Sequence, residues 1–264
     1  MVFKNGFHPF HIVDMSPWPL FGSLSAMSSI LSLYLVLNSL EVLSVFIFCL
    51  FSLLMVSFQW WRDVVRESTY QGFHSNKVCS GLSLGVVLFI LSEVMFFFSF
   101  FFGYFFIALN PDIEIGMCWP PKGIQPLNYM GVPFLNTIIL LSSGISITWA
   151  HHSILCSNYN QSLISLSITI FLGVIFSFFQ GMEYYESSFT MSDGVFGSLF
   201  FIATGFHGFH VMIGMIFISV CFFRLLMYQM SDRHHIGFES AAWYWHFVDV
   251  VWLFLFVSIY WWGS

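Results

Sequence analysis

Residues 78–109 read VCSGLSLGVVLFILSEVMFFFSFFFGYFFIAL, and this stretch contains a single charged side chain, Glu93. As an α-helix it is long enough to cross the roughly 30 Å hydrocarbon layer of a bilayer. The whole chain has the same character, since 58% of its 264 residues are hydrophobic and 8% are charged. A water-soluble domain would have too few polar side chains to cover its surface at that composition. The sequence therefore predicts an all-α membrane protein.

Six further apolar segments bring the number of expected transmembrane helices to seven, within a single membrane domain of residues 1–264. The expected helices cover residues 18–37, 42–68, 75–109, 131–155, 158–186, 194–227 and 236–262. Residues 1–9 are polar and short, so we expect no cleavable targeting segment. No internal repeat is evident, which weighs against a transporter built from inverted halves.

The basic residues indicate how these helices are oriented. With seven crossings the two termini lie on opposite sides of the membrane. If Lys4 is on the first side, the only basic residue on the second side is Lys122. The other residues on the first side are Arg62, Arg66, Lys77, Arg224 and Arg233. By the positive-inside rule, the side that holds the N-terminus is expected to face the inner compartment.

Glu93 is the acidic residue that lipid should tolerate least. Its neighbours three and four positions away are all apolar, namely Phe89, Ile90, Phe96 and Phe97. An ionised carboxylate is unfavourable in these surroundings, so we expect it to be protonated or paired with another helix. Two roles remain open: a proton-relay or regulatory carboxyl, and a hydrogen-bonded packing residue.

The last two expected helices each carry a polar stripe. His207 and His210 share one face of the expected helix 194–227. Helical spacing places Glu239, His246 and Asp249 along one stripe of the expected helix 236–262. Since consecutive helices are antiparallel neighbours, we expect His207 or His210 to pair with Asp249 or Glu239. The expected interhelical network comprises His207, His210, Glu239, His246 and Asp249.

A haem or metal site is the alternative for these histidines, because His-x-x-His is a plausible ligand spacing. Such a site would need further ligands and polar residues that hydrogen-bond to those ligands, so we predict no metal in this chain. On the same helix, Gly205 and Gly208 are expected to let another backbone approach closely.

The end of the second expected helix predicts a lipid site. Arg62 and Arg66 lie one turn apart beside indole rings at headgroup depth, where guanidinium groups suit a lipid phosphate. The alternative is an ordinary interface in which Asp63 and Glu67 pair with the arginines. The expected lipid-binding residues are Trp60, Trp61, Arg62, Arg66, Glu67 and His74.

Several familiar chemistries find no support. The five cysteines show neither a disulfide framework nor a zinc motif, and no Gly-rich phosphate loop or basic nucleic-acid patch is present. Glu183 and Glu186 lie near a predicted aqueous boundary, so we expect both to be solvated charges. No catalytic residue is therefore assigned.

A series of motifs, in order along the chain, resembles subunit III of mitochondrial cytochrome c oxidase. They are SPWPL at 16–20, QWWRDV at 59–64, REST at 66–69, SEV at 92–94, CWPP at 118–121, ITWAHH at 147–152, EYYE at 183–186, ATGFHG at 203–208 and AWYWHFVDVVWL at 242–253. The resemblance covers essentially the whole chain, and the last motif is highly specific. The chain departs from the pattern at Phe73, where the family usually has a polar residue.

This resemblance implies a fold in which two helices, residues 18–68, splay from five others, residues 75–262, and leave a cleft filled by phospholipid. It implies a non-catalytic core subunit of respiratory complex IV, which passes electrons from cytochrome c to oxygen and pumps protons. Haem and copper would sit in subunits I and II, so no cofactor besides bound phospholipid is expected here.

The resemblance also implies partners and a location. This subunit would stabilise subunit I, support proton uptake, and contact subunit II, small accessory subunits and anionic and zwitterionic phospholipids. It would lie in the mitochondrial inner membrane, with its N-terminus in the matrix and its C-terminus in the intermembrane space. Trp61, Arg66, Glu67 and His74 would contact headgroups, and Glu93 would be a buried carboxyl facing the cleft. A bacterial-type quinol oxidase relative and an independent transporter or channel are the alternatives.

Overall fold

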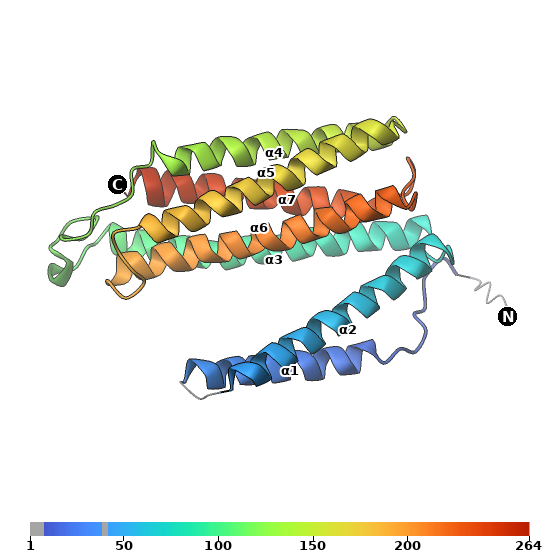
Figure 1. The fold of residues 1–264 in the computed structure, drawn as a ribbon, viewed down its shortest axis with the longest axis horizontal. Coiled ribbons are helices and arrows are strands. Elements are labelled where there is room, and N and C mark those ends of the chain that lie inside the picture. The colour runs from blue at the N-terminus through green and yellow to red at the C-terminus, as the bar shows by residue number, and fades with distance from the viewer. Residues whose placement is uncertain (1–7, 39–41, 264) are drawn as a thin grey trace. The chain divides into compact units, whose positions relative to one another are not determined.

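The computed structural model describes residues 8–38 and 42–263, and within them it contains helices and no strand (Figure 1). The transmembrane helices are α1 (Trp18–Leu37), α2 (Leu43–Thr69), α3 (Asn76–Ala108), α4 (Val132–Leu155), α5 (Tyr159–Glu186), α6 (Val195–Leu226) and α7 (Ile236–Leu255). A 3-10 turn, η1 (Ile113–Ile115), precedes α4, and α7 continues into a π-helical segment, η2 (Phe256–Trp261). Each expected helix boundary lies within about one residue of the observed one when α7 and η2 are taken as one segment, whereas α7 alone ends at Leu255.

All seven helices are long and apolar enough to cross a membrane, which confirms the all-α membrane fold. Lys4, which the expected orientation uses, lies outside the described residues, as do residues 1–7 of the segment that we expected to carry no targeting signal.

The chain divides into two compact units, Met1–Leu82 and Ser83–Ser264, with the boundary inside α3. In the first unit α1 packs against α2. In the second unit α5 packs against α4 and α6, while α7 packs against α4 and α6 (Figure 1). The lipid-filled cleft that the resemblance implies between two helices and five stays a prediction.

Small residues bring α1 close to α2 in the first unit. Ser25, Ser29 and Ser32 are buried on one face of α1, and their hydroxyls bond to carbonyls of their own helix. One turn earlier, Gly22 faces the Trp60 ring, whose Cζ3 would lie 3.5 Å from a Cβ at that position. Trp60 therefore contributes to helix packing as well as to the surface of the unit.

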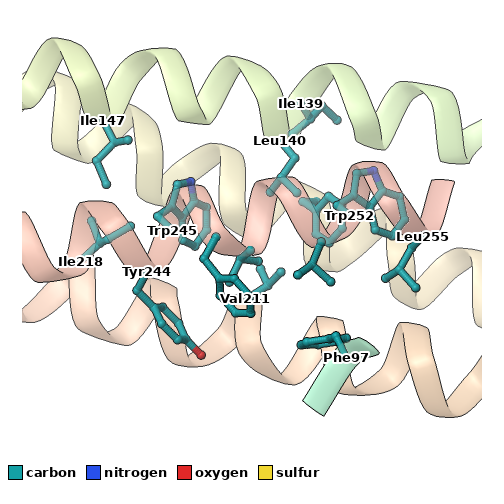
Figure 2. Close-up of a cluster of buried hydrophobic side chains, with 14 of the residues drawn as sticks. Phe97, Ile139, Leu140, Ile147, Val211, Ile218, Tyr244, Trp245, Trp252 and Leu255 are labelled. Carbon is teal, nitrogen blue, oxygen red and sulfur yellow. The ribbon is translucent and has the colours of Figure 1, made fainter. Parts of the chain in front are cut away.

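Two indole rings of α7 lie at the centre of the second unit (Figure 2). Trp245 and Trp252 are both 0% exposed. Their N–H groups donate to α4, from Trp245 Nε1 to Ser143 Oγ at 2.9 Å and from Trp252 Nε1 to Thr137 Oγ1 at 3.0 Å. A buried indole needs such an acceptor, because the bilayer interior offers no water. These contacts tie α7 to α4.

Glycines make room for Trp245 on the other side. A Cβ on Gly214 of α6 would lie 2.8 Å from Trp245 Cε3, and a Cβ on Gly173 of α5 would lie 3.0 Å from its Cη2. The prediction for Gly205 and Gly208 was wrong, because a Cβ at either would meet no heavy atom of the described chain within 4 Å. Helical spacing turns Gly205 toward the exposed side of α6 instead, one turn before the exposed Phe209.

We predict that Gly214→Ala destabilises the second unit by about 1–3 kcal/mol, because the added methyl group overlaps the Trp245 ring. Thermal denaturation of the purified assembly should show a lower midpoint than wild type. Gly208→Ala is the matched control on the same helix and should leave the midpoint unchanged. Equal midpoints for the two variants would show that the ring can move aside.

Candidate functional site

Glu93 of α3 pairs with His210 of α6. The distance from Glu93 Oε2 to His210 Nε2 is 2.9 Å, and 21% of the Glu93 side chain is exposed. The second-helix partner that the sequence called for is therefore present, although Glu93 is only partly buried. Phe97 packs against the His210 ring, with ring centroids 5.0 Å apart. The contact joins a polar pair across two otherwise apolar helix faces.

The hydrogen bonds of His210 show where a proton must be. Its Nδ1 lies 2.6 Å from the Phe206 carbonyl oxygen, which can only accept, so Nδ1 carries hydrogen and donates. The bond between Nε2 and Glu93 then requires one more proton, held either by the carboxyl or by the imidazole. The pair therefore holds a proton inside the bundle, as either a neutral acid beside imidazole or an ion pair.

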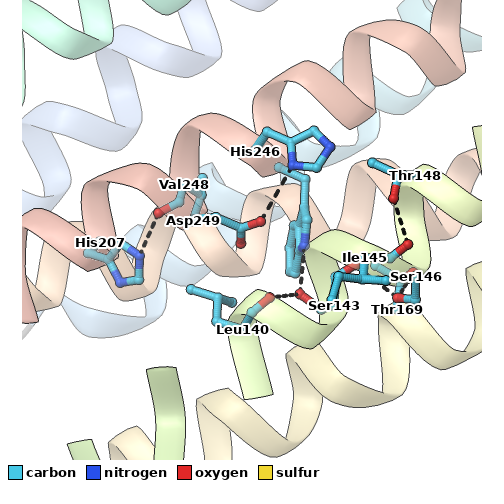
Figure 3. A network of polar contacts seen from close by, with 11 residues as sticks. Leu140, Ser143, Ile145, Ser146, Thr148, Thr169, His207, His246, Val248 and Asp249 are labelled. Atoms are coloured by element: carbon cyan, nitrogen blue, oxygen red, sulfur yellow. Dashed lines mark hydrogen bonds and ion pairs between the residues drawn. The ribbon is translucent and has the colours of Figure 1, made fainter. Parts of the chain in front are cut away.

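The expected pairing of His207 or His210 with Asp249 or Glu239 was wrong. His207, 1% exposed, donates from Nε2 to the Val248 carbonyl at 3.2 Å, so it joins α6 to α7 through the backbone (Figure 3). His210 is turned toward α3 instead. The sequence could not show this choice, because the same face of α6 meets both α3 and α7.

The acids of the α7 stripe contact histidines near them in sequence. Asp249 Oδ2 lies 3.7 Å from His246 Nδ1, three residues away (Figure 3), and Glu239 Oε1 lies 3.3 Å from His235 Nε2. Residues three or four apart share a helix face, so these partners are close without help from another helix. Asp249 also faces α4, where a Cβ on Gly144 would lie 2.7 Å from Oδ2. The five residues of the expected network thus make four separate contacts.

This geometry does not suit a haem bound by His207 and His210. Both nitrogens of His210 and Nε2 of His207 are already hydrogen-bonded within the protein. The His207 ring also packs against Trp252 and Phe176, with centroids 5.1 and 5.7 Å away. Aromatic side chains therefore pack directly against the His207 ring.

The expectation of a solvated charge was wrong for Glu183. It is 3% exposed, and its Oε1 accepts a 2.5 Å hydrogen bond from Tyr260 of η2 and a longer one from Gln180. Because α5 continues to Glu186, Glu183 lies on the inner face of the helix one turn before its end. Glu186 is exposed, as expected. The three-residue spacing from Gln180 was the signal in the sequence for this buried polar face.

The predicted lipid-binding residues lie at and just after the end of α2. Among them, Arg62 and Glu67 already have partners within the chain. Arg62 Nη2 lies 3.0 Å from Asp63 Oδ1, and the other oxygen of Asp63 accepts from Trp18 Nε1 at 2.7 Å. Arg66 is exposed, and within the part of the chain that the structure describes no carboxylate oxygen lies within 4.0 Å of it. Arg66 is therefore the guanidinium best placed to bind an external anion.

The N-terminal segment contributes a residue that the sequence analysis missed. His11 Nε2 lies 3.8 Å from Glu67 Oε2, and its ring stacks on Phe73 with centroids 5.0 Å apart. The ring of His74 is 6.0 Å away, and Ser75 Oγ donates to the Pro9 carbonyl at 2.7 Å. The segment before α1 thus packs against the end of α2, and nothing in the spacing of His11 pointed to this contact.

The fold and these contacts define a class, namely multi-pass helical membrane proteins with polar side chains inside the helix bundle. The sequence matches the family model described as "Cytochrome c oxidase subunit III" over residues 8–264. "Cytochrome c oxidase subunit 3" of Prototheca wickerhamii is 60% identical over 259 residues, covering 97% of this chain and 98% of the relative. The protein of that name from Chondrus crispus is 56% identical over 261 residues, covering 97% and 95%.

The chain belongs to the cytochrome c oxidase subunit III family. The resemblance that the motifs carried is therefore confirmed. The chain is a multi-pass membrane protein and a component of an oxidase complex that contains other oxidase subunits.

We predict that Glu93→Leu destabilises the packing of α3 on α6 by about 1–2 kcal/mol, because His210 Nε2 loses its partner. Glu93→Gln should be milder, since its amide can still bond to the imidazole. A double-mutant cycle with His210→Phe, read by resistance of the assembly to denaturant, should give a coupling of about 1 kcal/mol. Additive effects of the two substitutions would mean that the contact contributes nothing.

Proposed function

We propose that this chain is a non-catalytic core subunit of cytochrome c oxidase, respiratory complex IV, in which it stabilises subunit I and binds phospholipid. The complex transfers electrons from cytochrome c to oxygen and pumps protons. The observation that carries this proposal is that several polar side chains of the transmembrane helices are held by contacts within the chain, such as Glu93 with His210 and His207 with the Val248 carbonyl. Haem and copper belong to subunits I and II in this proposal, and this chain contributes contacts.

The lipid site of this proposal is the end of α2. Trp61 is 69% exposed, and Arg66, five residues further along α2, is exposed as well, so an apolar ring and a cation are both offered near the end of this helix. Asp63 offsets the charge of Arg62, which makes Arg66 the main phosphate ligand and Arg62 an auxiliary one. Glu67 and His74 shape the site together with His11, which approaches both side chains.

The proposed location is the mitochondrial inner membrane with the N-terminus in the matrix. Its support is the distribution of charge, since alternating crossings put five of the basic side chains in the described residues on the N-terminal side and Lys122 on the other. Subunits I and II and small accessory subunits are the proposed partners. In this orientation the end of α2 faces the matrix, where a proton-uptake role would have to act.

Arg66→Ala should weaken retention of anionic phospholipid by the purified complex about tenfold, because one charge-assisted contact to phosphate is lost. Native mass spectrometry of the complex measures the bound lipid. Arg233→Ala removes the same charge from the α6–α7 loop, where the side chain is 92% exposed and near Asp232, and is the matched control. Unchanged lipid content in the Arg66 variant would contradict the headgroup site.

Glu93→Gln should leave electron transfer from cytochrome c to oxygen close to the wild-type rate, because the carboxyl pairs with His210 and ligates no redox centre in this proposal. Oxygen consumption by the assembled complex is the measurement, with haem content as the check on assembly. Abolished oxygen reduction in a complex with normal haem content would reject the non-catalytic role.

A further inference from the structure

Three metal-binding side chains meet where α4 ends and α7 begins. Each of His151, His235 and Glu239 offers one ligand atom, and these three atoms all lie within 4.8 Å of one another. Sequence spacing brings together only His235 and Glu239, because α5 and α6 separate His151 from them along the chain. All three residues belong to the second unit, and the α4–α5 and α6–α7 connections lie at the same end of it (Figure 1).

We propose that His151, His235 and Glu239 form a binding site for one Zn²⁺ ion. Two imidazoles and one carboxylate are a ligand set that zinc favours, with water in the fourth position. The site goes beyond the proposed lipid-binding and stabilising function and does not depend on it. It is also separate from the Glu93–His210 pair, which involves different residues of α3 and α6.

The hydrogen bonding of His235 prepares it as a ligand. Its Nδ1 lies 3.0 Å from the Ser231 carbonyl oxygen, so Nδ1 carries the hydrogen and donates it. The neutral ring then presents a lone pair at Nε2, and a carbonyl acceptor behind the ring is the usual support of a metal-bound histidine. Nε2 is buried and makes no hydrogen bond within the described residues. A metal ion would satisfy it.

The spacing of the donor atoms fits one small ion after a modest adjustment. His235 Nε2 and Glu239 Oε1 are 3.3 Å apart, close to the roughly 3.4 Å expected for two ligands of one tetrahedral zinc. They lie four residues apart, a spacing that lets two side chains of one helix face share a metal. His151 is partly exposed, so its ring can move the remaining distance of at most roughly 1.4 Å toward the ion.

The charges near the site make Glu239 the critical ligand. The Arg224 guanidinium reaches the start of α7, since a Cβ on Gly237 would lie 2.8 Å from its Nη1. This fixed positive charge opposes a dication, so binding requires the Glu239 carboxylate to offset it. A zinc ion held here would join the end of α4 to the start of α7, at the end of the bundle opposite Glu183 and η2.

The direct test uses the intact oxidase complex, treated with a chelator and then supplied with Zn²⁺ alone. Anomalous scattering at the zinc absorption edge should show a peak between His151, His235 and Glu239 of the wild-type protein. A zinc-loaded complex with no peak at this position would overturn the proposal. This measurement needs no variant, so it decides the question even where a substitution prevents assembly.

Variants then test the ligands by zinc titration of complexes that have normal haem content. Glu239→Gln and His151→Gln should each weaken binding at this site by at least about tenfold. His152→Gln is the matched control, because His152 is the exposed neighbour of His151 and lies outside the cluster. Zinc should also raise the thermal midpoint of the wild type and of His152→Gln but not of Glu239→Gln. Wild-type zinc binding by Glu239→Gln would overturn the assignment.

Discussion

The hydrogen bond from Trp245 to Ser143 is the contact on which the packing of the second unit depends. The indole ring is fully buried, it donates to α4 at 2.9 Å, and glycines of α5 and α6 leave room for its edges. A lipid environment supplies no force that separates apolar from polar helix faces, so close packing and buried polar contacts must hold the helices together. Trp245 does both at once, which is why α7 is central and four helices meet around it.

The same constraint explains the remaining polar side chains and, through them, the function. In a medium without water, each buried polar group needs a partner inside the protein. Glu93 has His210, His207 has the Val248 carbonyl, and Glu183 has Tyr260. Arg66, at the end of α2, is exposed instead. These contacts are consistent with the proposed role of a subunit that acts by contact within an oxidase.

The helices could be predicted from the sequence because hydropathy and length alone define a transmembrane segment. The cost of burying a charge predicted that Glu93 needs a partner on another helix. The sequence did not identify that partner, because periodicity shows which residues share a helix face and not which helix that face meets. The sequence places Glu183 in the last turn of a helix but does not show that this face meets Tyr260 of η2. The roles of Gly205 and Gly208 were misjudged because only the fold shows which side of α6 meets a neighbour. The approach of His151 to His235 and the contact of His11 with Glu67 join segments distant in sequence, so no local motif could reveal them.

We propose that this subunit contributes packing and polar contacts to the oxidase and holds no redox cofactor. The most direct measurement is the haem and copper content per oxidase before and after this subunit is removed from the purified complex. The account predicts that both contents per catalytic core remain unchanged when the subunit is lost. Loss of one haem or one copper for each copy of this chain removed would contradict it.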